Sequence, residues 1–246
     1  MKTFLTSVCA IGLLAGTTML TACDNDYDSD YDYAHKTALV TVRPTSEGAF
    51  TMSLDDTTKL YPVNMKQSPF GNKEVRALVD YRIAAGTQAE KNQVLVLQID
   101  SIRTKATSPT MGSDEANTQR YGNDPIEIVK DWVTVAEDGY LTLRIRTRWG
   151  YNHTAHYVYL VTGTNKDNAY ELELRHNACG DTKGHLGDAL IAFNLQDLPR
   201  TESGDVKIKL TWTSFEGKKS ADFTLRIPEA SLTLGSENIA MNRRVK

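Results

Sequence analysis

Four side chains that can ligate a metal or act in nucleophilic catalysis lie within ten residues of one another. They are His176, Cys179, Asp181 and His185. Imidazole and thiolate groups are typical zinc ligands, but a structural zinc site takes four well-spaced ligands, and no Cys-x-x-Cys or His-Glu-x-x-His spacing occurs. A cysteine nucleophile would need a third group to orient its histidine. We therefore predict no metal or other cofactor, and expect His176 to bond the backbone of the loop that follows it.

Other catalytic motifs are missing from the sequence. There is no Gly-x-Ser-x-Gly elbow. The glycines of 180–187 miss the spacing of a dinucleotide-binding loop, so they favour turns instead. The sequence therefore predicts a protein that is not an enzyme.

Charged residues alternate with leucines and isoleucines in two predicted strands. Glu171 and Glu173 belong to one, and Arg144, Arg146 and Arg148 to the other. Alternation places each set on the exposed face of its strand. Cross-strand ion pairs between the two sets explain both without catalysis. A basic stripe that meets an anionic polymer is the alternative.

An aromatic tip between two predicted strands is the candidate ligand-binding site. Trp149, Tyr151 and His153 fall there, where exposed rings could stack on a sugar or a base. The alternative is that Trp149 folds back over the end of its domain as part of the core. Trp132 and Trp212 lie within strand patterns, so we expect both in the core.

The elements that must position these residues are strands of two β domains. Residues 37–105 contain five short alternating runs, at 38–43, 50–54, 59–63, 74–83 and 93–102. Five tightly connected strands indicate a small barrel, of OB type first and SH3-like second. So small a unit has a limited core, and we expect it to pack on its neighbour.

A Ser-, Thr-, Gly- and Asn-rich segment at 106–124 is interpreted as a linker. The strand pattern resumes in a second domain at 125–235, which precedes a tail at 236–246. Its seven expected strands lie at 126–135, 140–149, 156–162, 170–176, 188–195, 205–213 and 220–227. Their spacing, with no helical pattern between them, favours a β-sandwich. The predicted fold class is all-β, an OB-like barrel followed by a sandwich.

The N-terminus has the features of an export signal. Residues 1–22 have a basic start and an apolar run without acidic residues, as a secretory signal peptide does. The run ends in Leu-Thr-Ala-Cys, which resembles the lipobox of bacterial lipoproteins. The resemblance implies that Cys23 becomes the lipidated first residue of the mature protein, which its acyl chains hold in the membrane. A plain secretory signal with an incidental cysteine, or an uncleaved anchor, is the alternative.

An acidic tether at 23–36 follows the lipidation site. Five aspartates alternate there with small or tyrosyl residues, at positions 24, 26, 28, 30 and 32. Their mutual repulsion favours an extended, solvated segment. A calcium-binding EF-hand loop does not fit, because Ser29 stands where that loop needs glycine. The acidic run also loosely resembles the surface-export signals of Bacteroidetes lipoproteins.

Cysteine usage excludes a disulfide framework. Signal cleavage would remove Cys9 and lipidation would alkylate Cys23, leaving Cys179 as the remaining thiol. We interpret Cys179 as a small buried hydrophobic residue rather than a free reactive thiol. The domains must then be held together by their hydrophobic cores.

The order of these parts is similar to that of a known family. A lipoprotein signal, an OB-like domain, and a sandwich carrying LELRHNACGD (172–181) and LIAFNLQDLP (190–199) resemble the NigD-like lipoproteins of Bacteroidetes. The resemblance implies an N-terminal OB domain, a C-terminal β-sandwich and an envelope location. It carries no catalytic residue over to this chain, and the family's name derives from a bacteriocin locus.

These observations predict a non-enzymatic lipoprotein of the cell envelope that is lipid-anchored in the outer membrane, either on its periplasmic face or exposed at the cell surface. It would act as an accessory or binding module for a glycan, a peptide or an envelope protein. The alternatives are an envelope hydrolase with an inter-domain site and a protein of bacteriocin production or immunity. The net charge of -3 does not favour nucleic acid as a partner.

Overall fold

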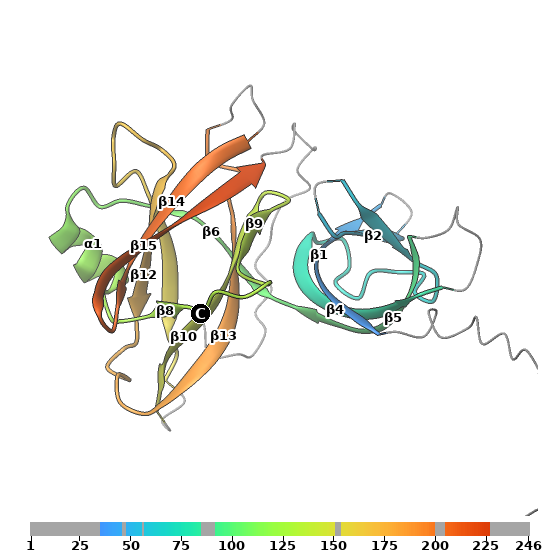
Figure 1. The fold of residues 1–246 in the computed structure, drawn as a ribbon, viewed down its shortest axis with the longest axis horizontal. Coiled ribbons are helices and arrows are strands. Elements are labelled where there is room, and N and C mark those ends of the chain that lie inside the picture. The colour runs from blue at the N-terminus through green and yellow to red at the C-terminus, as the bar shows by residue number, and fades with distance from the viewer. Residues whose placement is uncertain are drawn as a thin grey trace, which may run out of the picture. The chain divides into compact units, whose positions relative to one another are not determined.

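Strands form nearly all of the regular structure. The computed structural model describes residues 35–45, 48–55, 57–84, 92–150, 154–199 and 205–226. Within these ranges the strands make a closed barrel and two further sheets, as the all-β prediction expects (Figure 1). The signal peptide, Cys23, the tail at 236–246 and all of the tether except its last two residues lie outside them. None of the described residues belongs to a helix long and apolar enough to cross a membrane.

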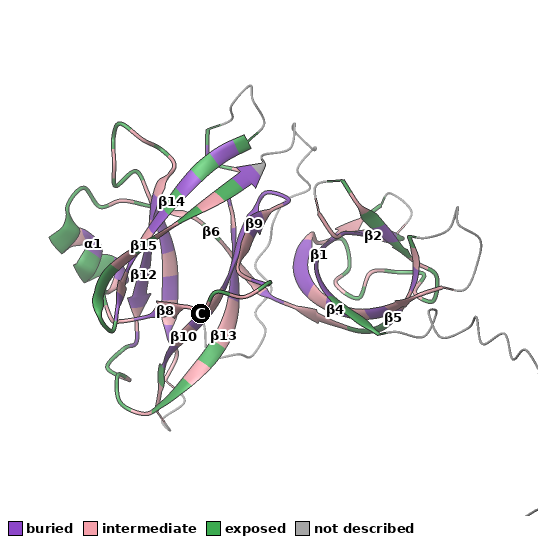
Figure 2. Cartoon of the chain, in the orientation of Figure 1, coloured by how far each residue is buried: buried purple, intermediate pink, exposed green. Residues whose placement is uncertain are grey.

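The N-terminal domain is a barrel of five strands. These are β1 (Lys36–Pro44), β2 (Phe50–Ser53), β3 (Lys59–Pro62), β4 (Val75–Ile83) and β5 (Gln93–Ser101). Their order is β1-β2-β3-β5-β4, and the pairing of β1 with β4 closes the barrel. Alternate residues point inward, and Val40, Met52, Val79 and Val94 are fully buried (Figure 2). The predicted OB-type barrel is confirmed.

The C-terminal domain is a sandwich of two sheets. One contains β6 (Arg103–Ala106), β13 (His185–Asn194), β10 (Tyr140–Trp149) and β8 (Glu127–Ile128) in that order, with β9 (Val135–Glu137) also paired to β10. The other contains β15 (Gly217–Arg226), β14 (Asp205–Ser214), β12 (Glu171–Asn177), β11 (Tyr157–Thr162) and β7 (Ser108–Pro109). The predicted sandwich is therefore confirmed.

Alternation along the strands builds the sandwich core. Leu143 and Ile145 of β10 are fully buried in one cluster with Leu160, Phe193 and Ile208 from four strands in all. The arginines between them on β10 point away from this core. Trp212 packs into the same cluster, as predicted.

The linker interpretation of 106–124 is wrong. Strand β7 within it pairs with β11, and α1 (Asp114–Tyr121) packs on β11 and β12. Ser113 caps the helix by accepting the Ala116 N–H at 3.1 Å, and Tyr121 is buried. Residues 103–105 also belong to the sandwich, because β6 pairs with β13. An eight-residue helix is too short to give a clear periodic signal, which is why the segment reads as a loop.

The prediction of a core position for Trp132 is also wrong. The expected strand at 126–135 is interrupted between β8 and β9 by a turn, closed by the Thr134 hydroxyl donating to the Val129 carbonyl at 2.7 Å. Trp132 lies in this turn with 56% of its surface exposed. A turn removes the alternation that would have pointed the ring inward.

The barrel packs on the sandwich through an apolar cluster, as its small core led us to expect. The two domains belong to one compact unit. Leu39 of β1 and Ala192 of β13 are buried in this cluster together with Ile102, which joins the domains in sequence. The chain therefore continues from one domain to the other through a packed junction.

Polar side chains complete this junction. Arg76 of β4 is fully buried and donates to the hydroxyls of Thr41 at 3.0 Å and Thr142 at 3.3 Å. It also pairs with the Glu137 carboxylate. Beside it, the Tyr140 hydroxyl donates to Glu74 at 2.6 Å, and burial raises the pKa of Tyr140. Because these bonds join barrel residues to sandwich residues, they fix the two domains to each other.

Candidate functional site

Trp149 is the only residue of the predicted aromatic tip within the described part of the chain. Tyr151 and His153 lie outside it. Trp149 continues the inward-facing series of β10, packs against the sandwich core, and donates its indole N–H to the Gly187 carbonyl at 2.8 Å. A Cβ on Gly187 would lie 2.6 Å from the indole Cδ1, so the ring needs a glycine beside it. This geometry favours the interpretation of Trp149 as part of the core over the ligand-stacking one.

A buried chain of polar groups lies behind the Trp149 ring. His156 and Trp149 have ring centroids 4.2 Å apart. His156 Nδ1 lies 2.9 Å from His176 Nε2, and His156 Nε2 lies 3.3 Å from Asp181 Oδ2. At the far end, His176 Nδ1 is 3.3 Å from the Pro125 carbonyl oxygen. Three segments of the sandwich, at Pro125, at His156 and at 176–181, are thereby joined.

The electrostatics of this chain follow from burial. His156 is fully buried, and the Asp181 side chain is only 7% exposed. Burial, together with the neighbouring His156, lowers the pKa of His176 to about 4, although Asp124 opposes the shift. His176 is therefore neutral at physiological pH. The prediction that His176 bonds the backbone of the loop that follows it is wrong, because its Nδ1 faces the carbonyl of Pro125, which lies 51 residues earlier in the sequence.

The buried chain does not have the form of a hydrolytic site. Both rings are inaccessible to a substrate, and no hydroxyl or thiol of the described residues is hydrogen-bonded to either ring. The predicted burial of Cys179 is wrong, since its side chain is exposed. Cys179 occupies a turn, with a φ of 52°, and its N–H donates to the Asn177 side chain. His185 is exposed as well. Within the described ranges, no group of three or more His, Cys, Asp and Glu side chains could hold a metal ion.

Two of the three arginines in the β10 row are paired with neighbouring carboxylates, and the third, Arg148, donates to the Gly184 carbonyl at 3.1 Å. Arg144 pairs with Asp131 and, at 2.6 Å, with Asp188, and Arg146 pairs with Asp188 at 2.6 Å. Ion pairing was expected, but the predicted partners Glu171 and Glu173 lie in the other sheet. Because Asp131 and Asp188 offset the positive charge of Arg144 and Arg146, the row does not favour the binding of an anionic polymer.

Both predicted glutamates have partners within their own sheet. Glu171 pairs with Lys209 at 3.5 Å, and Glu173 pairs with the buried Arg175 at 2.8 Å. Arg175 also bonds Asp114 of α1 at 2.5 Å. These contacts hold strands and helix together rather than forming a paired-carboxylate site.

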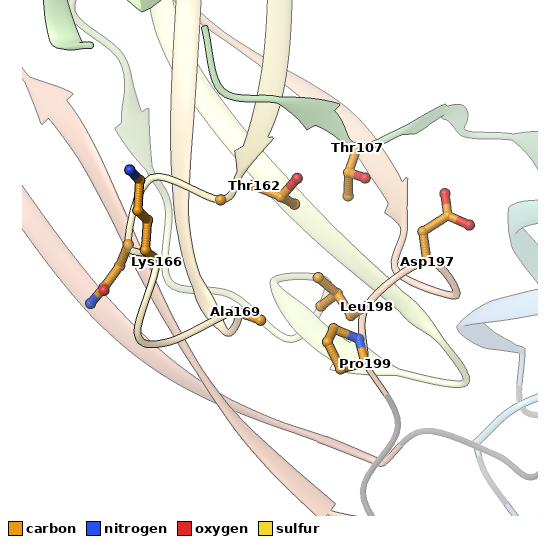
Figure 3. A pocket seen from close by; sticks show the side chains of 9 residues that line it. Thr107, Thr162, Lys166, Ala169, Asp197, Leu198 and Pro199 are labelled. Atoms are coloured by element: carbon orange, nitrogen blue, oxygen red, sulfur yellow. The ribbon is translucent and has the colours of Figure 1, made fainter. Parts of the chain in front are cut away.

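A pocket of about 400 Å³ opens at the opposite end of β11 from His156. Figure 3 shows Thr107, Asp197 and Leu198 lining it on one side and Lys166 and Ala169 on the other. Leu198 is buried and forms its base, whereas the two charged side chains are exposed to water. None of the described residues that line the pocket is aromatic, so these residues offer a ligand little beyond a shallow contact.

An exposed apolar strip runs along β3 and β5 of the barrel. It consists of Tyr61, Val63, Leu95 and Leu97, which we call the barrel strip. Tyr61, Val63 and Leu97 have 48%, 48% and 45% of their surface exposed. The Val63 N–H donates to the Val94 carbonyl at 2.9 Å, and β3 runs parallel to β5, which places these residues side by side.

The barrel strip was not identified from the sequence, although a signal is present. Leu60 alternates with Lys59 and Tyr61, so burying Leu60 exposes both neighbours. Grouped apolar side chains on a surface mark interaction sites more often than isolated ones do. The strip is therefore the surface in the described residues that best fits a binding role.

Family models match both domains of the chain. Residues 39–102 match the NigD-like N-terminal OB domain, and residues 107–225 match the NigD-like C-terminal beta sandwich domain. No curated protein matches the chain.

Solved structures with the same fold come from species of Parabacteroides and Bacteroides. A protein of Parabacteroides distasonis provisionally described as toxin-related is 31% identical, with a TM-score of 0.66 over 78% of this chain and 94% of its own. A NigD-like immunity protein of Bacteroides caccae is 19% identical, with a TM-score of 0.53 over 77% and 92%. A protein of Bacteroides fragilis provisionally described as a lipoprotein is 15% identical, with a TM-score of 0.51 over 80% and 100%.

Proposed function

Because the chain belongs to the NigD-like family, we propose that it is a lipid-anchored, non-catalytic binding protein of the cell envelope. The observation that carries the binding role is the barrel strip, an exposed apolar surface on a closed barrel whose own core is already filled. The outer faces of OB barrels are common recognition surfaces. The lipoprotein description of the B. fragilis structure supports the anchor.

The chemistry of the barrel strip favours a protein partner over a glycan. Sugar sites stack rings and bond hydroxyls, whereas Val63, Leu95 and Leu97 offer aliphatic surface suited to apolar side chains. Lys59 is exposed two residues before Tyr61 on the same face of β3, and Lys66 is exposed just beyond Val63. The strip therefore suits a partner that presents apolar side chains beside carboxylates.

Photo-cross-linking tests the binding role. A photoreactive residue at position 61 or 97 of the full chain should give a discrete cross-linked product in intact cells, because both side chains would be covered by the partner. The matched control is position 207, since Lys207 is exposed on β14 of the sandwich. An excess of wild-type chain without the photoreactive residue should suppress the cross-linked product, because it competes for the partner. An excess of the Tyr61→Asp, Leu97→Asp chain should not suppress it. Equal products at all three positions, or none at 61 and 97, would contradict the proposal.

Metabolic labelling tests the anchor. Radiolabelled palmitate should enter the wild-type chain, and the label should be lost in Cys23→Ala because no thiol remains at the acylation position. Cys179→Ala is the control, since it removes the exposed thiol of the sandwich and should keep the label. Label retained in Cys23→Ala would overturn the anchor.

A role in immunity is a second candidate. The B. caccae structure is described as an immunity protein and the P. distasonis structure as toxin-related. An immunity protein of this kind would act by binding a toxic protein, which the barrel strip could do. Deleting the gene should then sensitise the cells to the bacteriocin of a neighbouring strain, and re-expression of the wild-type chain but not of the Tyr61→Asp, Leu97→Asp chain should restore resistance. Unchanged sensitivity after deletion would exclude this role.

The envelope hydrolase is not favoured by the Asp181–His156–His176 chain. A general base must reach the proton it abstracts, and both imidazoles are enclosed by the sandwich. We propose instead that this chain has a structural role at the end of the domain.

A further inference from the structure

The buried chain of Asp181, His156 and His176 has a proton count that can be worked out from its contacts. It has three links: Asp181 to His156, His156 to His176, and His176 to the Pro125 carbonyl. Both ends are acceptors, since an ionised carboxylate and a carbonyl carry no donor hydrogen. Three hydrogen bonds need three hydrogens, and two neutral imidazoles supply only two. With only two hydrogens, one link would place two lone pairs against each other. A third proton removes this repulsion.

An unfilled link would be costly at this position. His156 and His176 are shielded from water, so a lone pair that meets another lone pair cannot turn to solvent instead. The Pro125 carbonyl also accepts the Thr147 hydroxyl at 3.1 Å and has a second lone pair for His176. The geometry therefore favours the state in which all three links contain hydrogen.

We propose that His156 holds this third proton as a buried imidazolium at neutral pH, and that the proton fastens the end of β10 to the loop after β12. Its Nε2–H would donate to Asp181 and its Nδ1–H to His176. His176 would then be the neutral Nδ1–H tautomer, which donates to Pro125. The proton belongs on the ring because imidazole is ordinarily the stronger base, with a pKa of about 6.5 against about 3.9 for an aspartic carboxyl.

The surroundings of His156 favour a positive charge. From β10, the face of the Trp149 ring lies against it, and aromatic faces attract cations. From the loop after β12, Asp181 supplies the negative partner. From the segment before β8, Asp124 adds a carboxylate near His176, where it accepts the Ala178 N–H at 2.8 Å.

Asp181 connects the protonated ring of His156 to the backbone N–H of Gly150. Its Oδ2 atom, which faces His156, also accepts the N–H of Gly150 at 2.9 Å. A Cβ on Gly150 would lie 2.1 Å from the other carboxylate oxygen, so the contact is close. Loss of the proton would leave this carboxylate without its cation and loosen the end of β10.

The protonation state can be read directly from the rings. The full chain carrying His35→Gln, His153→Gln and His185→Gln, labelled with 15N-histidine, retains only the two buried rings. Nitrogen–hydrogen correlation spectra at pH 7 should show one ring protonated at both nitrogens and one neutral Nδ1–H tautomer. Two neutral rings at pH 7 would overturn the proposal.

Removing the carboxylate of Asp181 tests whether the proton connects the end of β10 to the loop after β12. Asp181→Asn should abolish the imidazolium signal and speed exchange of the Gly150 amide, whereas Asp188→Asn, on the exposed face of β13, should change neither. An imidazolium that persists in Asp181→Asn would contradict the proposal. If that variant does not fold, the ring spectra of the Asp181-containing chain still decide it.

Discussion

Replacing Arg76 with methionine should lower the free energy of unfolding by about 3 kcal/mol. The guanidinium is fully buried between the domains and bonds two hydroxyls and the Glu137 carboxylate. Methionine fills much of the same volume but donates nothing, so Thr41 and Thr142 lose a donor and Glu137 loses a cation at a junction largely closed to water. Urea unfolding of the full chain, followed by circular dichroism, measures the loss.

The matched control for Arg76 is Arg146, whose pair with Asp188 lies on an exposed face. Arg146→Met should cost less than about 1 kcal/mol, because solvent screens exposed ion pairs. A second sign of a weakened junction would be two separate unfolding transitions in Arg76→Met where the wild-type chain shows one. If Arg76→Met and Arg146→Met cost the same, the buried pair does not hold the domains together.

The barrel was predictable because apolar residues that enter its core recur at every second position of its strands. Val40 and Val42 are separated by Thr41, and burying the valines sets the register of β1 against its neighbours. The same argument located β10, where Leu141, Leu143 and Ile145 form the buried face. These patterns record which face of a strand is buried, so they predict fold class and strand positions.

The Asp181–His156–His176 chain could not be predicted in the same way. His156 and His176 are 20 residues apart, and only the pairing of Val158 with His176 brings their rings together. Alternation within a strand excludes a register shift of one residue, but it does not say which residue of the neighbouring strand lies opposite His176. The inward position of Trp149 could have been predicted from the alternation along β10, because Trp149 lies two residues beyond the buried Thr147 and on the same face of the strand.

Lowering the pH from 6.5 to 4 should remove about 3 kcal/mol of stability through His176 alone. In the unfolded chain this imidazole binds a proton below about pH 6.5, whereas in the folded chain burial lowers its pKa to about 4. Between these values the unfolded state binds more protons than the folded one, so stability falls as the pH falls. The loss begins near pH 6.5 and is complete near pH 4.

The variant that isolates this contribution is His176→Gln, which keeps a polar side chain but cannot titrate. Its free energy of unfolding should be lower than wild type at pH 7 yet depend less on pH between 6.5 and 4, by about 3 kcal/mol over the range. Carboxylates far from position 176 that titrate near pH 4 affect both chains equally and cancel in the difference. His185→Gln removes an exposed imidazole from the same end of the sandwich and should leave the wild-type slope unchanged. A His176→Gln slope equal to wild type would mean that the buried ring takes up its proton as readily when folded as when unfolded. The neutral, Nδ1-protonated state assigned to His176 would then be wrong.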